Sequence, residues 1–272
     1  MKKHPLFLIP AVASLMAFLF LCTGQVQAGC RNPNVVEEQD FWLVPAAASG
    51  LIEVKWFGHS FFQITSSSGT KIITDPFGAM GFPMPDVWPH VVTIGREHGN
   101  HNNAGLAKGE PIILRGLKDW GKDWNQVNTT FRDVLIYNVP IHQRGYSSYE
   151  GSLRGSAFVF EMDGLCILHS GDVSEPFNED QIELIGHVDV LLQTIGGTFT
   201  IGPEGAKKII EQLKPKVIVP MHYWYYQNIL ERFTDGPYRA RFLNVNKFTI
   251  SKDTLPPAPE IYVLKVVREG DL

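Results

Sequence analysis

Four short apolar segments of this sequence are each followed by a histidine or an aspartate. Each segment is rich in Val, Ile and Leu, a pattern that is typical of a buried strand. A side chain that follows such a strand lies on a loop held by a rigid scaffold, which is a common way to place metal ligands. The residues in these positions are His98, His101, His142, Asp172 and His222.

The residue types in this set are those that bind zinc. Zinc takes imidazole nitrogens and carboxylate oxygens, and a hydrolytic site leaves one position open for water. Bound water ionises near neutral pH and becomes a nucleophile. A single histidine after a strand is more often a structural residue, so the prediction of one or two zinc ions depends on the joint pattern.

Composition and charge set the class of protein. The chain has 272 residues, of which 44% are hydrophobic and 19% charged, enough for one large domain or two small ones. The formal net charge is −4 and there is no basic patch, so nucleic acid is not an expected partner.

The N-terminus has the features of a secretory signal peptide. Lys2 and Lys3 precede an apolar run over residues 5–22, and small residues follow at 26–28. The run is short and contains two prolines, so we expect residues 1–28 to be removed rather than to span a membrane. The mature chain is then periplasmic or extracellular, with no membrane span.

The mature chain keeps two cysteines. Cys30 lies in a predicted leader, residues 29–50, and follows a sequence that would also suit attachment of a lipid anchor. Cys166 lies in an apolar run and is predicted to be buried. A disulfide between the two is an open alternative in an oxidising compartment.

The order of elements predicts an α+β fold, with a single domain over residues 51–272. The first half is rich in strands and begins with an antiparallel meander, and the second half alternates strands and helices. This order fits two mixed sheets packed face to face with helices outside. The expected strands are 51–57, 61–65, 71–74, 91–94, 111–114, 134–139, 157–161, 165–168, 188–193, 217–219 and one near 261–267, and the expected helices are 179–186 and 203–213. Residues 143–155 are expected to form a polar loop.

Several motifs carry a resemblance to a known family. They include W-F-G-H-S-F-F-Q-I, I-I-T-D-P-F, H-S-G-D, V-D-V-L-L-Q-T-I-G-G and K-P-K-V-I-V-P-M-H-Y. In their order and spacing they resemble the metallo-β-lactamase superfamily, in the branch related to ascorbate-6-phosphate lactonase, over residues 51–223. The resemblance implies a four-layer αβ/βα sandwich with its metals at one edge, between the sheets.

The signature loop of that family, H-x-H-x-D-H, is changed in this chain. The aligned residues read R-E-H-G-N-H, so Arg96 replaces the first histidine and Asn100 replaces the aspartate. By resemblance, each of the two metal sites loses one ligand. The first site keeps His98, His142 and Asp172, and the second keeps His101, Asp172 and His222.

The two replacements differ in their chemistry. Arginine cannot ligate zinc, and its charge repels a dication. Asn100 is a weak ligand and cannot act as a general base. Arg96 either pairs with Asp172 and fills the first site, or turns outward to bind an anionic group of the substrate.

Three further features have open roles. Asp75 matches a family carboxylate that supports the metal histidines, and is alternatively a turn residue before proline. His59 lies on a loop that approaches the site in related proteins. The aromatic residues 224–226, just after His222, form either an apolar wall of the site or part of the core.

The sequence therefore predicts an exported hydrolase with one zinc ion, which attacks an ester, lactone or phosphoester of a small molecule. The alternative is a metal-free binding protein on the same fold, with Arg96 in the first metal site.

Overall fold

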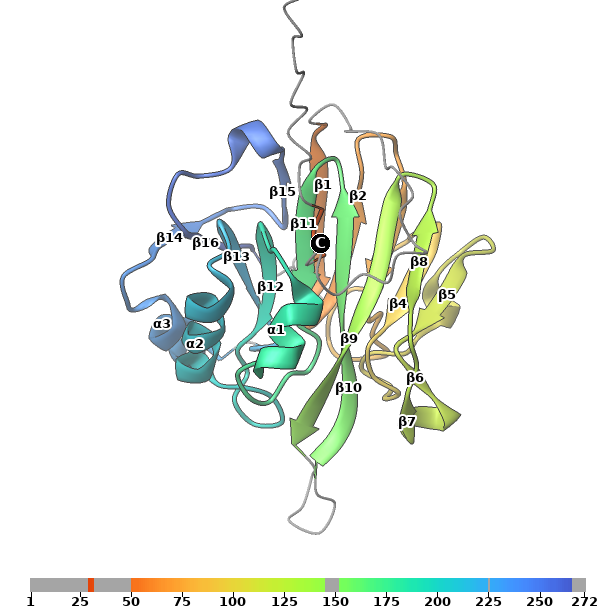
Figure 1. The fold of residues 1–272 in the computed structure, drawn as a ribbon. Helices are drawn as coiled ribbons and strands as arrows, with labels where there is room; N and C mark the ends of the chain where they lie inside the picture. Colours follow the sequence, from red (N-terminus) through yellow and green to blue (C-terminus); the bar gives the residue numbers. More distant parts are fainter. Residues whose placement is uncertain (1–28, 32–49, 145–151, 225, 266–272) are drawn as a thin grey trace, which may run out of the picture.

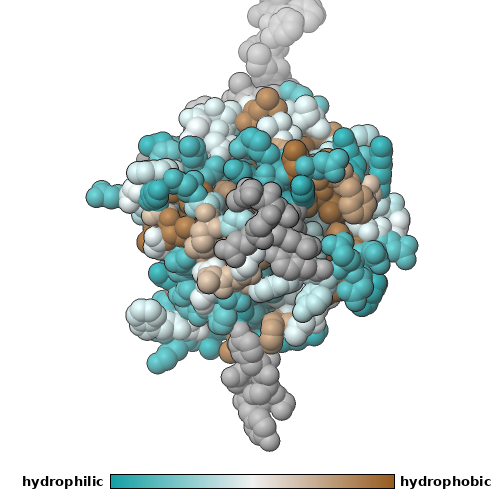
Figure 2. All heavy atoms as spheres, turned by 180° about the vertical axis from the view of Figure 1, so that it is seen from behind, coloured by the Kyte–Doolittle hydropathy of each residue, from teal (hydrophilic) through white to brown (hydrophobic). Residues whose placement is uncertain are grey.

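The computed structural model describes residues 29–31, 50–144, 152–224 and 226–265 (Figure 1). The predicted signal peptide, most of the predicted leader and the end of the last predicted strand lie outside these residues. Among the residues described, no helix is both long and apolar enough to cross a membrane. Seen from behind, hydrophilic and hydrophobic side chains are mixed over the surface (Figure 2).

The first sheet has six strands in the order β15-β1-β2-β3-β4-β5. The strands β1, β2 and β3 form the predicted antiparallel meander. The strand β4 then pairs in parallel with β3, and β5 pairs in parallel with β4. The strands are β1 (Ile52–Gly58), β2 (Phe61–Thr65), β3 (Lys71–Thr74), β4 (Val91–Ile94), β5 (Ile112–Arg115) and β15 (Lys247–Ile250).

The second sheet has eight strands in the order β14-β16-β13-β12-β11-β10-β9-β8. The strands β8 to β11 are antiparallel, and those from β11 to β14 are parallel. They are β8 (Asn128–Phe131), β9 (Val134–Arg144), β10 (Ser152–Met162), β11 (Leu165–His169), β12 (Val190–Thr194), β13 (Val217–Met221), β14 (Arg239–Phe242) and β16 (Glu260–Val263). A separate two-stranded hairpin consists of β6 (Leu117–Lys118) and β7 (Asp123–Trp124).

The two sheets pack face to face, and each is covered on its outer side. The helices α1 (Glu179–Ile185), α2 (Pro203–Leu213) and α3 (Gln227–Thr234) lie over the second sheet (Figure 1). A smaller apolar cluster, which includes Phe61, Phe77 and Phe82, covers the outer face of the first sheet. The covering segment has a 3₁₀ turn at Ala104–Leu106. The predicted α+β sandwich is confirmed, and this outer layer is largely irregular chain.

The main core lies between the sheets. In β1 every second residue is buried, so Ile52, Val54 and Trp56 point inward while the residues between them are partly exposed. Every residue of β12 and β13 is buried, because these parallel strands are covered on both faces.

The pair β9 and β10 is longer than expected. The two strands pair from Ser152 opposite Arg144 to Glu161 opposite Leu135, whereas we expected a strand to end at residue 139 and a loop to cover 143–155. The polar composition of residues 142–144 favoured a loop, but the ladder between the strands continues through them. The helix α3 and the strands β14 and β15 were not predicted either.

Cys30 is a fixed part of the core rather than of a flexible leader. It is fully buried and forms a disulfide with Cys166, with a Cα–Cα distance of 5.4 Å. Its backbone N–H donates to Glu161 Oε2 at 2.9 Å, and its carbonyl accepts from the N–H of His187 at 2.8 Å. The thiol of Cys30 is therefore not available for a lipid anchor while this disulfide is formed.

Candidate metal centre

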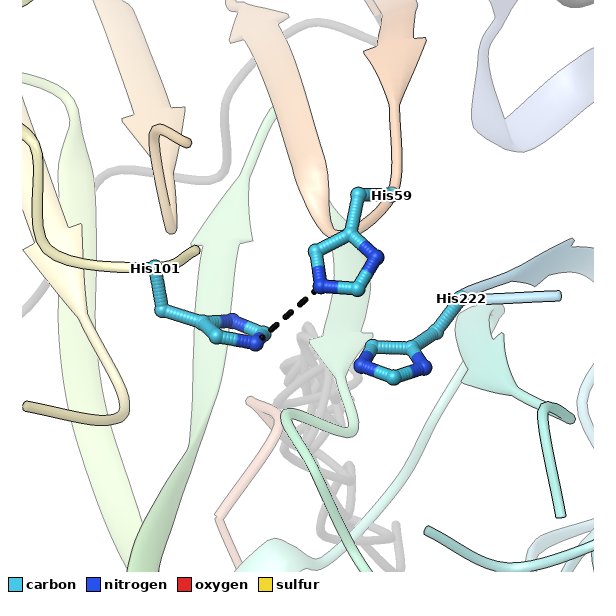
Figure 3. A group of neighbouring side chains, drawn as sticks. All are labelled: His59, His101 and His222. Carbon is cyan, nitrogen blue, oxygen red and sulfur yellow. Dashed lines mark hydrogen bonds between the residues drawn. The ribbon is translucent and has the colours of Figure 1, made fainter. Parts of the chain in front are cut away.

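Three histidines from distant parts of the chain converge at one edge between the two sheets. His59 lies in the turn between β1 and β2, His101 in the loop after β4, and His222 directly after β13 (Figure 3). One ring nitrogen from each lies within 4.8 Å of the other two. This is the only such group of three or more candidate ligands found among the residues that the structure describes.

The backbone holds His59 in an unusual conformation. Its φ is 49°, a left-handed value that few residues other than glycine adopt, and Gly58 before it has a φ of 117°. Two hydrogen bonds to the carbonyl of His59 fix the turn, from Trp56 Nε1 at 3.0 Å and from the N–H of His222 at 3.2 Å. The turn of the first sheet is thus tied directly to the end of β13. Backbone strain of this kind concentrates at functional sites.

Asp75 orients the ring of His101. Its Oδ2 lies 3.2 Å from Nδ1 of His101, and its Oδ1 accepts a hydrogen bond of 2.6 Å from the N–H of Gly95. A carboxylate behind a histidine fixes the tautomer of the ring and raises the basicity of the other nitrogen. Nε2 of His101 therefore points toward His59, at a distance of 3.2 Å from its Nε2 (Figure 3).

Asp172 lies at the centre of the buried charges. Three nitrogens surround its Oδ2: Arg96 Nη1 at 2.8 Å, Gln143 Nε2 at 2.9 Å and His101 Nε2 at 3.1 Å. Its Oδ1 lies 3.3 Å from Nε2 of His222 but has no well-formed hydrogen bond. One carboxylate oxygen is thus fully engaged, and the other lies beside His222.

The charges of Asp172 and His101 depend on each other. Burial raises the pKa of Asp172, but its neighbours His101, His222 and Arg96 outweigh that effect and hold the pKa well below its usual range. Burial alone lowers the pKa of His101, but Asp172 and then Asp75 outweigh it and raise the pKa to about 9. At neutral pH the ion-free centre therefore has an ionised Asp172 and a protonated His101.

The other two histidines of the group are neutral at pH 7. Burial, together with the nearby His222 and His101, lowers the pKa of His59 well below its usual value. Burial also lowers the pKa of His222, although Asp172 opposes the shift. Neutral imidazoles are the form that binds a metal ion.

The rest of the changed signature loop lies beside this group. Arg96 is buried and pairs with Asp172, one of the two alternatives that the sequence left open. His98 is not one of the three clustered histidines, and its Nδ1 accepts a hydrogen bond of 3.3 Å from the N–H of Asn100. Burial and the charge of Arg96 lower the pKa of His98.

The structure does not bring His142 into the centre. Its side chain is 43% exposed, lies 4.0 Å from Glu175, and meets the ring of Trp124 edge to face. Because β9 continues to Arg144, successive side chains alternate between its two faces. Gln143, which is fully buried, therefore points inward to Asp172 where we expected His142.

Sequence reasoning gave too little weight to three residues. His59 was expected to face the site or to lie behind the metal ligands, not to be a ligand itself, although the interruption of an apolar strand by G-H-S was a usable signal. Nothing in the sequence indicated that Gln143 belongs to the site, because the direction of its side chain depends on where β9 ends. Gly196 was given no role in the site, and the structure gives it a specific neighbour in His222.

Gly196 leaves room for His222, and this leads to a prediction. A Cβ atom at this position would lie 2.2 Å from the carbonyl oxygen of His222 and 3.0 Å from its Nδ1. We expect Gly196→Ala to displace His222, to lower the free energy of unfolding by about 1–3 kcal/mol, and to weaken metal binding. Urea unfolding and titration with a divalent metal ion measure the two effects. Gly99→Ala is the matched control, because a Cβ atom there meets nothing within 4 Å. Equal behaviour of the two variants would contradict the prediction.

Comparison with known proteins agrees with this geometry. The family described as the beta-lactamase superfamily domain matches residues 53–222. A UPF0173 metal-dependent hydrolase of Pyrococcus abyssi is 33% identical over 200 residues, which cover 64% of this chain and 85% of that protein. A crystal structure from Thermotoga maritima, described as a candidate zinc-dependent hydrolase of the metallo-β-lactamase superfamily, is 30% identical with a TM-score of 0.61. That match covers 79% of this chain and 99% of the other.

The chain therefore belongs to the metallo-β-lactamase superfamily. Its relatives place it among the metal-dependent hydrolases of that superfamily, of the UPF0173 group. The narrower resemblance to ascorbate-6-phosphate lactonase stays a prediction.

Proposed function

We propose that this protein is an exported hydrolase that binds one metal ion, zinc, through His59, His101, His222 and Asp172. The substrate is a small molecule with an ester, lactone or phosphoester bond. The observation that carries the proposal is the convergence of three histidine nitrogens within 4.8 Å of one another, beside a buried carboxylate oxygen that lacks a hydrogen bond.

The types of donor atom, and two of the distances between them, fit a zinc ion. Tetrahedral zinc with Zn–N bonds of about 2.0–2.1 Å separates its ligand nitrogens by roughly 3.3 Å. The Nε2 atoms of His59 and His101 are 3.2 Å apart, and Asp172 Oδ1 is 3.3 Å from Nε2 of His222. Three imidazoles and one carboxylate are ordinary zinc ligands, and binding would release the proton that His101 holds in the ion-free centre.

The remaining polar residues have supporting roles. A bound ion supplies Lewis acidity, which ionises water near neutral pH and polarises a carbonyl or phosphoryl oxygen. Asp75 holds the His101 ring so that Nε2 faces the ion, and His59 takes the ligand place that Asn100 cannot fill. Arg96 and Gln143 hold Oδ2 of Asp172, which leaves Oδ1 for the ion.

The same contacts support one ion rather than two. In related two-metal sites, the carboxylate corresponding to Asp172 bridges the ions. Here the guanidinium of Arg96 lies 2.8 Å from Oδ2, where its positive charge opposes a second cation. His142 faces away, so the first site also lacks one of the ligands that the resemblance assigned to it.

Elemental analysis of the purified protein tests the proposal directly. We expect about one zinc per chain after reconstitution and dialysis, and hydrolysis of at least one member of a panel of esters, lactones and phosphodiesters. Two zinc ions per chain would refute the single-ion centre. No zinc, even after incubation with excess metal, would refute the hydrolase.

A second function is favoured by one contact. The Arg96–Asp172 ion pair already neutralises the carboxylate, as an internal cation would in a metal-free binding protein. The same zinc measurement separates the two functions, since a binding protein of this kind would remain metal-free.

The disulfide supports export, because such bonds persist mainly in oxidising compartments. A chain that lacks residues 1–28 retains only Cys30 and Cys166. We expect no free thiol in this chain when it is denatured without reductant, and two after reduction. Since the bond joins residues 136 positions apart, we also expect reduction to lower the free energy of unfolding by about 2–5 kcal/mol. Two free thiols in protein secreted under native conditions would contradict the prediction.

A further inference from the structure

We propose that Trp224 determines the specificity of this centre by binding an apolar group, alkyl or aromatic, next to the scissile bond of the substrate. The inference rests on the proposed function, because it concerns the substrate of the same site. It goes beyond that function by naming a recognition residue and the chemical class of the group that it binds.

The first observation is the position of the Trp224 ring. It meets the ring of His59 nearly edge-on, with centroids 6.1 Å apart and an interplanar angle of 78°. Trp224 also follows His222 by two residues, so it is next to two of the three clustered histidines. The residue is 38% exposed, so part of this large apolar surface faces solvent beside the candidate metal ligands.

The second observation is that buried aromatic rings pack against Trp224. The ring of Phe82 lies 5.9 Å from it between centroids, and the ring of Phe77 lies 5.3 Å behind Phe82. Phe82 packs so closely on Gly58 that a Cβ atom there would lie 2.5 Å from the phenyl ring. The rings of Trp224, Phe82 and Phe77 therefore pack on the same turn that presents His59. A group bound against Trp224 is held at a fixed position relative to the three histidines.

The third observation is the backbone of the segment. Trp224 has a φ of 52° and His222 a φ of 58°, both in the left-handed region. A bulky residue rarely adopts this conformation, and it persists where the surrounding structure imposes it. The local backbone thus holds the indole beside His59 at a conformational cost, as expected for a residue that positions a ligand.

The apolar surface of Trp224 determines which chemical group it binds. Trp224 offers an apolar indole face without charge, so an alkyl or aromatic group gains by leaving water against it, while the buried Phe82 only supports the ring. An anionic group would lose hydration there without compensation.

The experiment uses two probes that differ only in the apolar group. Phenylphosphonate and methylphosphonate present the same anionic head, and neither has an ester bond to hydrolyse. Their dissociation constants are measured by calorimetry on the purified zinc-loaded protein and on Trp224→Ala, Trp224→Phe and Trp88→Ala. Trp88 is the matched control, because it is 60% exposed and lies over Lys108 rather than over a histidine of the centre. Zinc content is measured on every sample.

We expect the unmodified protein and Trp88→Ala to bind phenylphosphonate on the order of tenfold more tightly than methylphosphonate. Trp224→Ala should lose this preference while its affinity for methylphosphonate stays the same, and Trp224→Phe should keep most of it. No preference in the unmodified protein, or an unchanged preference in Trp224→Ala, would overturn the proposal. Absence of zinc from every sample would instead refute the proposed function and this proposal with it, whereas in zinc-loaded samples the ratio of the two affinities decides the role of Trp224 alone.

Discussion

Asp172→Asn is expected to lower the free energy of unfolding by about 3–5 kcal/mol. The carboxylate is fully buried and is the partner of the Arg96 guanidinium, whose side chain is only 9% exposed. The amide of asparagine is neutral, so the buried Arg96 would lose the charge of the Asp172 carboxylate beside it. The amide oxygen would accept from the donors around Oδ2 without a negative charge, and such hydrogen bonds are weaker than those to a carboxylate.

Urea unfolding in the presence of EDTA measures this effect. The chelator removes the contribution of bound metal, which would otherwise stabilise the unmodified protein alone. Asp86→Asn is the control, because Asp86 pairs with Lys108 at 3.0 Å on the surface, where both side chains are more than half exposed. Exposed pairs contribute little, so this variant should unfold like the unmodified protein.

A double variant shows whether the loss comes from the buried charge. Arg96→Met removes the cation with a side chain of similar length, so Arg96→Met/Asp172→Asn has neither charge. We expect the double variant to be more stable than Asp172→Asn alone, since the buried guanidinium that has lost the charge of Asp172 is gone. If Asp172→Asn cost less than about 1 kcal/mol, the ion pair would not be the buried interaction that the distances indicate.

The part of the fold that follows from local pattern could be predicted from the sequence. The meander of β1 to β3 follows from short strands separated by turn residues, and the β10–β11 hairpin from Met162-Asp163-Gly164. In that turn Asp163 and Gly164 both adopt positive φ, which asparagine, aspartate and glycine tolerate best. The pairing of β15 with β1 joins segments almost 200 residues apart, and no local pattern indicates it.

The candidate site depends on finer detail than the fold. Whether His142 or Gln143 reaches Asp172 is decided by one residue of register, because side chains alternate along a strand. The family pattern favoured His142, and the continuation of β9 to Arg144 puts Gln143 there instead. The place of His59 depends on a left-handed turn at Gly58 and His59, which the sequence G-H-S permits but does not require.

His59→Ala is expected to weaken zinc binding by more than about 100-fold, while His142→Ala should leave it within about twofold. Nε2 of His59 lies 3.2 Å from Nε2 of His101, so the alanine variant loses one of four proposed ligands. His142 contacts Glu175 and Trp124 on the outer face of β9, away from the three clustered histidines. Competition with a chromophoric chelator measures both affinities.

His59 is buried, so its loss could also disturb the fold. His59→Gln keeps most of the side-chain volume and the ability to form hydrogen bonds, and circular dichroism with thermal unfolding checks each variant. If His59→Gln folds normally and binds zinc poorly, the imidazole itself is a ligand. Normal zinc binding by both His59 variants, with loss in His142→Ala, would mean that the ligands follow the family pattern through His98 and His142. The metal would then have to displace Arg96 from Asp172, and the contacts of Arg96 would describe only the ion-free protein.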